Sequence, residues 1–260
     1  MKIWHEGKMK IGIKDGSEIK SMREGGRILG LILEELGKKI VPGMTGLELD
    51  AIAEKMMADH HVLPSFKGYK GFRYVTCINI NDQVVHGIPS DRRFAPGDIV
   101  TIDCGVIHND FHTDSAITKP VGAITPELQK FIATAEKALQ KAIQTARPGI
   151  RVREISGVIE DIITKNGYSV VPDLIGHGIG HNLHEDPQVP NYRDRDPGPI
   201  LQEGMTIAIE PIFAMGSGKV KQLNDGWTYV TTDGSPAVQV EHTIAITAKG
   251  CEVLTKRPSE

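Results

Sequence analysis

Few of the groups that stabilise extracellular or membrane proteins occur in this sequence. Its 260 residues include three cysteines, Cys77, Cys104 and Cys251, an odd number that lacks the spacing of a zinc knuckle. No run of 18 apolar residues is present, and the polar N-terminus does not resemble a signal peptide. We therefore expect a reducing, cytoplasmic setting without membrane association.

The chain also lacks a strong net charge. Lysine plus arginine total 30 and aspartate plus glutamate total 33, which gives −3 at pH 7. This balance argues against a specific nucleic-acid partner for the molecule as a whole. Residues 1–16 are interpreted as an extended N-terminal extension, and the lysines of this region are expected to form a solvated basic tail. The five in the first twenty residues are Lys2, Lys8, Lys10, Lys14 and Lys20.

What the sequence does contain is an internal repeat. The segment Gly97–Asp103 (GDIVTID) has a counterpart 107 positions later in Gly204–Glu210 (GMTIAIE), and both copies end in a carboxylate. Pro42-Gly43 and Pro148-Gly149 recur at a nearly equal offset of 106 positions. A constant offset across separate segments indicates two related halves that share one sheet.

Helical periodicity appears at matching places in the two halves. Ser17 is the predicted N-cap of a first helix, and Thr45 with Glu48 forms a capping box for a second. In the second half, Thr125 is predicted to start a helix, and another helix is predicted to end at Asn166. β-Rich runs with glycine and proline turns follow each helix pair.

Runs of helices followed by runs of strands predict an α+β fold. We expect the helices to cover one face of a mostly antiparallel sheet and to leave the other face for a site. The repeat places the halves at about residues 17–121 and 122–250 of a single domain, 17–260. Each half would bring a pair of acids to the centre, and four buried acids need cations, which points to a metal site.

Asp103 and Asp114 lie on the two arms of a predicted hairpin. His108-Asn109 offers a two-residue turn, which would place the two aspartates directly opposite each other, about 5 Å apart at Cβ. Facing carboxylates destabilise a hairpin unless a cation lies between them. The alternative interpretation is that both acids are solvated on an exposed face. The apolar residues beside them argue against it. Cys104 would point to the opposite face, into the core.

A glycine-rich segment that starts at Gly176 carries His177 and His184. Its alternating glycines permit close approach of backbone or substrate and argue against a helix. The two histidines cannot form the helical pair of a zinc peptidase, because position 188 is Gln. One of them is predicted to be a metal ligand, and both are predicted to be functional. His86, before a turn, is ambiguous on its own.

Together these residues resemble the ligand pattern of the methionine aminopeptidases, and the chain is most similar to the type I form. The ligands would be Asp103, Asp114, His177, Glu210 and Glu241. The family motifs occur in order as VHGIP (85–89), GHGIG (176–180), HEDP (184–187), IEP (209–211) and EHT (241–243). The resemblance covers about residues 17–250 and implies the two-fold pseudosymmetric pita-bread fold, in agreement with the repeat. The interval between His184 and Glu210 is too short for the insertion of the type II form.

The resemblance implies a metallo-exopeptidase that removes the initiator methionine from nascent polypeptides, preferably when the second residue is small. Two divalent ions of the manganese, iron, cobalt or zinc kind would activate water and polarise the scissile carbonyl. Asp103 would bind one ion, and His177 with Glu210 would bind the other. Asp114 and Glu241 would bridge both.

The resemblance also implies roles in catalysis and binding. Glu210 would carry a proton to the leaving amine, His184 would stabilise the tetrahedral intermediate, and His86 would position the peptide backbone. A pocket rich in aromatic residues would favour the methionine thioether. The predicted substrate contacts are His86, His184, Tyr69, Phe72, Cys77 and Trp227.

Four residues depart from the family pattern, namely Arg73, Tyr74, Leu174 and Leu183. They are expected at the rim of the pocket and leave the breadth of side-chain preference open. Two alternatives remain. One is a proline-directed relative such as prolidase or aminopeptidase P, which usually has a large additional N-terminal domain. The other is a binding protein that has lost its metal ligands. The presence of all five ligands argues against the latter. The expected partners are N-terminal methionine peptides and nascent chains. We expect a monomer, and a transient contact with the ribosome is left open.

Overall fold

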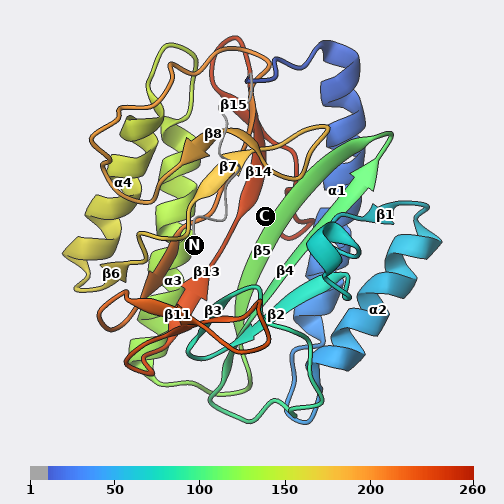
Figure 1. Ribbon diagram of the computed structural model, residues 1–260, viewed down its shortest axis with the longest axis vertical. Helices are drawn as coiled ribbons and strands as arrows, with labels where there is room; N and C mark the ends of the chain where they lie inside the picture. Colours follow the sequence, from blue (N-terminus) through green and yellow to red (C-terminus); the bar gives the residue numbers. More distant parts are fainter. Residues whose placement is uncertain (1–10) are drawn as a thin grey trace.

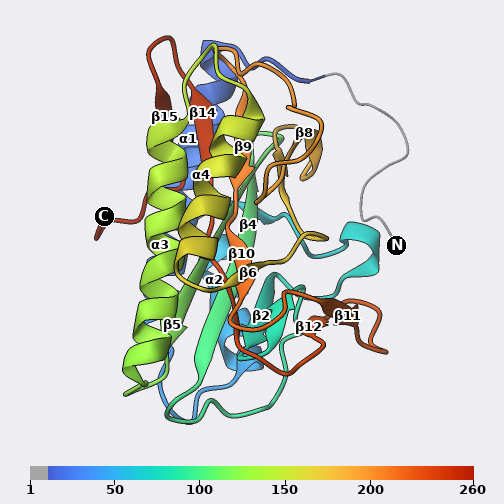
Figure 2. The same ribbon diagram turned by 90° about the vertical axis from the view of Figure 1, so that its left-hand side faces the viewer.

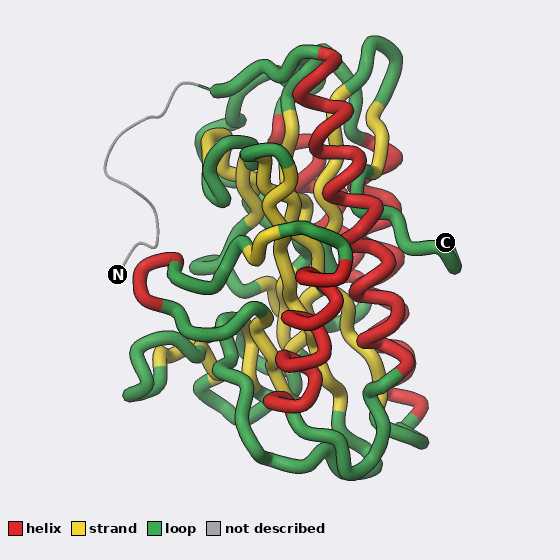
Figure 3. The backbone as a smooth tube through the Cα atoms, turned by 90° about the vertical axis from the view of Figure 1, so that its right-hand side faces the viewer, coloured by secondary structure: helices red, strands yellow, loops and turns green. Residues whose placement is uncertain are grey.

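The computed structural model describes residues 11–260. Its α-helices lie on one side of the molecule and its strands lie beside them, as Figures 1, 2 and 3 show from three directions. The α-helices are α1 (Gly16–Lys38), α2 (Gly46–Asp59), α3 (Pro126–Thr145) and α4 (Val152–Lys165), with a short 3₁₀ helix, η1 (Tyr69–Gly71). Within this part of the chain, no helix combines the length and apolar character needed to cross a membrane.

The strands form antiparallel sheets that reflect the two halves of the sequence. In the first half, β4 (Ile99–His108) pairs with β1 (Leu63–Pro64), β2 (Thr76–Ile80) and β5 (Phe111–Pro120). In the second half, a five-stranded sheet has the order β15 (Cys251–Val253), β14 (His242–Ile246), β9 (Thr206–Ile209), β7 (Gly176–Gly178) and β8 (Glu185–Val189).

Two smaller sheets complete the strand layer. One has the order β13 (Ala237–Gln239), β10 (Ile212–Ala214) and β6 (Ser169–Val170), and the other β11 (Val220–Gln222), β12 (Tyr229–Thr231) and β3 (Gln83–Val85). All pairs are antiparallel, so the predicted α+β fold with helices over a mostly antiparallel sheet is confirmed.

The duplication extends to the backbone conformation. Gly43 and Gly149 both have φ 89°, a left-handed conformation that glycine adopts without steric cost. Their amides donate to equivalent carbonyls, Gly43 to Phe94 (2.9 Å) and Gly149 to Leu201 (2.9 Å). The two halves of the pita-bread fold therefore contain the same turn between their two helices, held by the same hydrogen bond.

Local signals fix most helix ends. The capping box of Thr45 and Glu48 is present, and Thr125 caps α3, as predicted. The predicted cap Ser17 is wrong, because α1 is capped by Asp15, whose carboxylate accepts from the amides of Ser17 (2.8 Å) and Glu18 (3.0 Å). Aspartate at this position reaches two exposed N–H groups at once.

The two largest apolar clusters of the core lie one in each half. The first packs α1 and α2 against β2 and β4, for example Leu29 and Leu33 with Val100 and Ile102. The second packs α3 and α4 against β9 and β14, with Phe131 among its largest fully buried side chains. Each such buried side chain contributes about 1.5–3 kcal/mol, so each half anchors its own strands.

The two halves join where β5 runs beside the segment that enters β14. Ala116 and Glu241 exchange backbone hydrogen bonds of 3.4 and 3.0 Å. Hydroxyl groups extend this contact: Ser115 donates to the Glu241 carbonyl (2.6 Å), and the Thr243 hydroxyl accepts from the Asp114 amide (2.9 Å) and donates to the Asp114 carbonyl (2.8 Å). These bonds hold the backbone at Asp114 beside the backbone at Glu241, and both residues are predicted ligands.

The hairpin of β4 and β5 differs in register from the prediction. Its turn is Asn109-Asp110, with φ of 49° and 65°, which suits a tight hairpin turn. Asp103 therefore pairs with Ala116, and Asp114 pairs with Gly105. The prediction that Asp103 and Asp114 lie directly opposite is wrong. They are diagonal neighbours on one face, and Cys104 on the other face is buried in the core, as predicted.

The predicted solvated basic tail is wrong at Lys14. Its side chain is buried, with the residue 7% exposed, whereas Lys20 is exposed as expected. Lys2, Lys8 and Lys10 lie outside the described residues.

Candidate active site

A cavity of about 490 Å³ lies at the seam between the halves, and all five predicted metal ligands line it. Asp103 comes from β4 and Asp114 from β5, while His177 comes from β7. Glu210 directly follows β9, and Glu241 directly precedes β14. Each half therefore contributes two acids, and the second half adds the imidazole.

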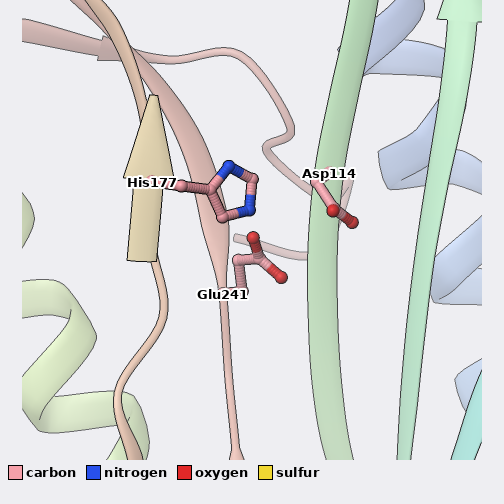
Figure 4. A group of neighbouring side chains, drawn as sticks. All are labelled: Asp114, His177 and Glu241. Atoms are coloured by element: carbon pink, nitrogen blue, oxygen red, sulfur yellow. The ribbon is translucent and has the colours of Figure 1, made fainter. Parts of the chain in front are cut away.

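Three of these side chains form a compact group. Asp114, His177 and Glu241 each offer one ligand atom, and these atoms lie within 4.8 Å of one another. Figure 4 shows the three side chains as neighbours. Nε2 of His177 is also 3.8 Å from Oε1 of Glu210. All five residues are buried, so these charged groups are shielded from bulk water.

Burial dominates the electrostatics of the acids. It raises the pKa of Asp103 to about 7 and raises the pKa values of Asp114, Glu210 and Glu241 well above their ordinary range, with neighbouring carboxylates adding to the effect in those three. Among the described residues, no hydrogen-bond donor reaches Oδ1 of Asp103, Oδ1 of Asp114 or Oε1 of Glu241. Buried acceptors without donors are costly, and divalent cations would satisfy them.

The geometry around His177 suits a metal ligand. Its Nδ1 is 2.9 Å from the Gly178 carbonyl, to which it donates a hydrogen, and this leaves the lone pair on Nε2. Burial lowers the pKa of His177 to about 4, so the ring is neutral at pH 7. The imidazole can therefore bind a cation at Nε2 without first losing a proton.

Two further histidines line the same cavity. The His184 ring lies 4.5 Å from the His177 ring, centroid to centroid, and its Nδ1 is 2.9 Å from the Tyr69 hydroxyl. Burial lowers the pKa of His184 well below its usual value, and burial followed by the nearby Lys70 lowers the pKa of His86 to about 4. Both rings are therefore neutral hydrogen-bonding groups at pH 7.

An aromatic pocket adjoins the acids. Phe72 and Trp227 meet edge to face with centroids 5.0 Å apart, and Tyr69 and Cys77 line the same cavity. Burial raises the pKa of the Cys77 thiol well above its usual value, so the sulfur stays protonated. The structure thus brings all four predicted pocket residues together beside the acids.

The four departures from the family pattern divide into two groups. Leu174 and Leu183 line the cavity, as expected for the rim of a pocket. Arg73 and Tyr74 are not among the described residues that line the cavity, so their place at its rim stays a prediction. Tyr74 instead packs edge-on against Phe72, at 6.0 Å between centroids.

Gln239 is a site residue that the sequence reasoning missed. Its amide Nε2 is 3.3 Å from Oδ2 of Asp103 and 3.3 Å from Oε2 of Glu210, so it can donate to acids from both halves. The signal was present in the sequence, because Gln239 is a polar residue two positions before Glu241 in an apolar run, and such residues share one face of a strand. Asn191, also missed, donates to the Glu210 carbonyl (2.9 Å).

Comparisons with known proteins agree with this geometry. Residues 20–248 match metallopeptidase family M24. The chain is 46% identical over 243 residues to methionine aminopeptidase 1 of Bacillus subtilis, which covers 94% of this chain and 98% of that protein. The crystal structure of a methionine aminopeptidase from Thermotoga maritima superposes with a TM-score of 0.93 at 40% identity. The match covers 95% of this chain and 100% of the Thermotoga chain. A prolidase from Pyrococcus horikoshii superposes with a TM-score of 0.77 at 28% identity, over 94% of this chain and 63% of the prolidase.

Proposed function

Because this chain belongs to metallopeptidase family M24, we propose that it is a methionine aminopeptidase of type I. It would hydrolyse the first peptide bond of nascent polypeptides and release the initiator methionine, preferably when the second residue is small. The observation that carries this proposal is the convergence of four buried carboxylates and His177 beside an aromatic pocket.

Sequence identity and pocket chemistry favour this activity over the alternatives. Identity is 46% and 40% to methionine aminopeptidases but 28% to the prolidase. Sulfur–aromatic contacts contribute about 0.3–1.5 kcal/mol each, so the Phe72 and Trp227 rings suit a methionine side chain. A binding protein without catalysis would not need five clustered ligands.

The donor set fits divalent metal, and we propose two ions of the manganese, iron, cobalt or zinc kind. Asp103 would hold one ion and His177 with Glu210 the other, while Asp114 and Glu241 would be shared. Carboxylate and imidazole donors suit such ions better than thiolate chemistry would. When bound, the ions would supply an activated water and a Lewis acid for the scissile carbonyl.

The protein's own groups would orient the peptide and move protons. Glu210, a buried carboxylate that lines the cavity, would carry a proton to the leaving amine. If the Tyr69 hydroxyl donates to Nδ1 of His184, that ring carries its hydrogen on Nε2 and can donate to the scissile carbonyl oxygen as negative charge develops there. His86, which lines the same cavity, would bind the peptide backbone.

A substrate assay tests the proposal directly. Purified protein should release methionine from Met-Ala-Ser, lose this activity with a chelator, and leave Ala-Pro uncut. Cleavage of Ala-Pro in place of Met-Ala-Ser would instead support a prolidase. If neither peptide is cut with manganese, iron, cobalt or zinc, only a binding function remains.

Tyr69→Phe is expected to lower kcat about 10-fold while KM changes little, because loss of an outer hydrogen bond that orients a functional imidazole costs about 10–100-fold. Steady-state kinetics on Met-Ala-Ser would measure this. Tyr74→Phe is the matched control, since Tyr74 lies outside the cavity-lining residues described here and should keep normal kcat. Equal kinetics for the two variants would contradict the role of the Tyr69 hydroxyl.

Without metal, the protein is expected to lose thermal stability as pH rises through about 7. A carboxyl with a raised pKa stabilises the fold while it is protonated, and this contribution is lost as pH rises through the folded-state pKa, about 7 for Asp103. The lowered pKa of His177 acts in the opposite direction between about pH 4 and 6.5, so the loss of stability is expected to show above pH 6.5.

Thermal unfolding of chelator-treated protein at several pH values, with and without added manganese, would measure this effect. Manganese should restore the melting temperature most at the higher pH, because metal binds the deprotonated acids. Asp103→Asn should flatten the slope of the metal-free protein. A melting temperature that rises with pH above 7 in the absence of metal would contradict the expectation.

We further propose that residues 17–260 form a single catalytic domain with pseudo-repeat halves at about 17–121 and 122–250, preceded by an extension, 1–16. A cytoplasmic setting is supported by three free cysteines. A monomer is proposed because one chain supplies all five ligands. Transient contact with the ribosome, where nascent chains emerge, would fit such a substrate.

A further inference from the structure

Lys14 forms a buried ion pair beside the cavity. Its Nζ lies 2.6 Å from Oε2 of Glu185, and the two side chains are only 5% and 10% exposed. Glu185 directly follows His184, the residue to which we assign stabilisation of the intermediate. The N-terminal extension therefore contacts the segment that carries this imidazole.

The lysine side chain is fitted closely between two glycines. A Cβ added to Gly180 would lie 2.4 Å from Cε of Lys14, and one added to Gly12 would lie 2.9 Å from Nζ. The backbone is anchored as well, since the Lys14 amide donates to the Gly204 carbonyl (2.8 Å). Any larger residue at Gly180 would displace the ammonium group, so this contact depends on the glycine-rich sequence of the loop.

Glu185 in turn closes the loop that leads to His184. Its second oxygen, Oε1, accepts from the Asn182 amide (3.0 Å), and the Asn182 carbonyl accepts from the Gly180 amide (3.1 Å). Lys14 supplies the opposite charge that this carboxylate needs, because a charge buried without a partner is strongly unfavourable. The loop 180–185 is thus held from outside by a residue of the extension.

We propose that Lys14 is a positioning residue for catalysis, which acts through Glu185 to hold the loop 180–185 and hence the imidazole of His184. Lys14 does not line the cavity and would touch no substrate. The effect on catalysis rests on the proposed peptidase function, whereas the effect on the loop does not. A shift of about 1 Å in a catalytic group can cost about 100-fold in rate.

Lys14→Met tests this, because it keeps the length of the side chain and removes the charge. We expect kcat on Met-Ala-Ser to fall about 10–100-fold, with KM within about two-fold and bound metal unchanged. Lys20→Met, which removes an exposed lysine nearby, is the matched control and should keep wild-type kinetics. Wild-type kcat in Lys14→Met, or a loss equal to that of Lys20→Met, would overturn the proposal.

A double-mutant cycle separates this role from general damage. Glu185→Gln keeps an acceptor for Asn182, and the double variant K14M/E185Q leaves no buried unpaired charge. If the pair acts as a unit, the double variant should be no slower than Lys14→Met alone. Losses that multiply in the double variant would show independent roles and overturn the proposal.

Hydrogen–deuterium exchange provides a readout that does not depend on activity. Amides of residues 179–185 should exchange about 10-fold or more faster in Lys14→Met, while those of α3 stay protected as an internal reference. Unchanged exchange in the loop would overturn the proposal whatever the kinetics, and faster exchange with normal kcat would overturn the positioning role. If the wild-type protein releases no methionine, the proposed function fails, and exchange still shows whether Lys14 holds the loop.

Discussion

Asp114→Asn is expected to reduce methionine release by about 1,000-fold or more, a loss of about 4 kcal/mol of transition-state stabilisation. A carboxylate offers two anionic oxygens, whereas an amide offers one neutral oxygen and a donor group, so asparagine cannot be shared between two cations. The shape of the side chain is kept. The bonds from the Asp114 backbone to Thr243 should also persist, so the fold is expected to remain intact.

Kinetics on Met-Ala-Ser in buffers of controlled manganese concentration, together with the metal content of the variant, would measure this loss. Asp110→Asn is a matched control on the same hairpin, because Asp110 is exposed in the turn and asparagine tolerates its left-handed conformation. That variant should keep normal activity and metal content. Near-normal turnover in Asp114→Asn would refute the assignment of Asp114 as a shared ligand.

Local signals made much of the fold predictable. The repeat from Gly97 and Gly204, the Pro-Gly turns and the capping box at Thr45 are all encoded within a few residues, and the structure contains the corresponding elements. The α+β arrangement followed from the order of helices and strands alone. The ligand set came from a resemblance whose motifs are spread across the chain, and the structure places those residues around one cavity.

The register of the β4–β5 hairpin was harder to predict. Both His108-Asn109 and Asn109-Asp110 contain residues that enter tight turns, so the sequence did not decide between them. The turn begins one residue later than predicted, which moves the partner of Asp103 from position 114 to Ala116. Because this change is two residues in register, both aspartates keep the same face, and the predicted cluster survives the error.

Contacts between distant segments were beyond the sequence. The partner of Lys14 lies 171 positions away, and a lysine is usually a solvated residue. The sequence places Gln239 on the same strand face as Glu241, but its two acceptors, on Asp103 and Glu210, come from different halves. Both interactions depend on how the halves and the extension pack together. A local sequence pattern does not predict such packing.

His184→Ala is expected to lower kcat about 100–1,000-fold, the usual cost of removing one hydrogen-bond donor that stabilises developing charge. Metal content should be nearly unchanged, because the compact donor group comprises Asp114, His177 and Glu241 and does not include His184. Kinetics on Met-Ala-Ser with parallel metal analysis would separate the two effects. His60→Ala, at an exposed histidine that caps the end of α2, is the control and should leave both quantities at wild-type values.

Combining this variant with Tyr69→Phe would identify how the imidazole acts. If the Tyr69 hydroxyl contributes only by orienting His184, its removal should cost nothing further once the ring is gone, so the double variant should match His184→Ala. A further loss in the double variant would assign Tyr69 a separate contact with the substrate. A metal-depleted His184→Ala protein would instead place His184 among the ligands and refute its assignment to the intermediate.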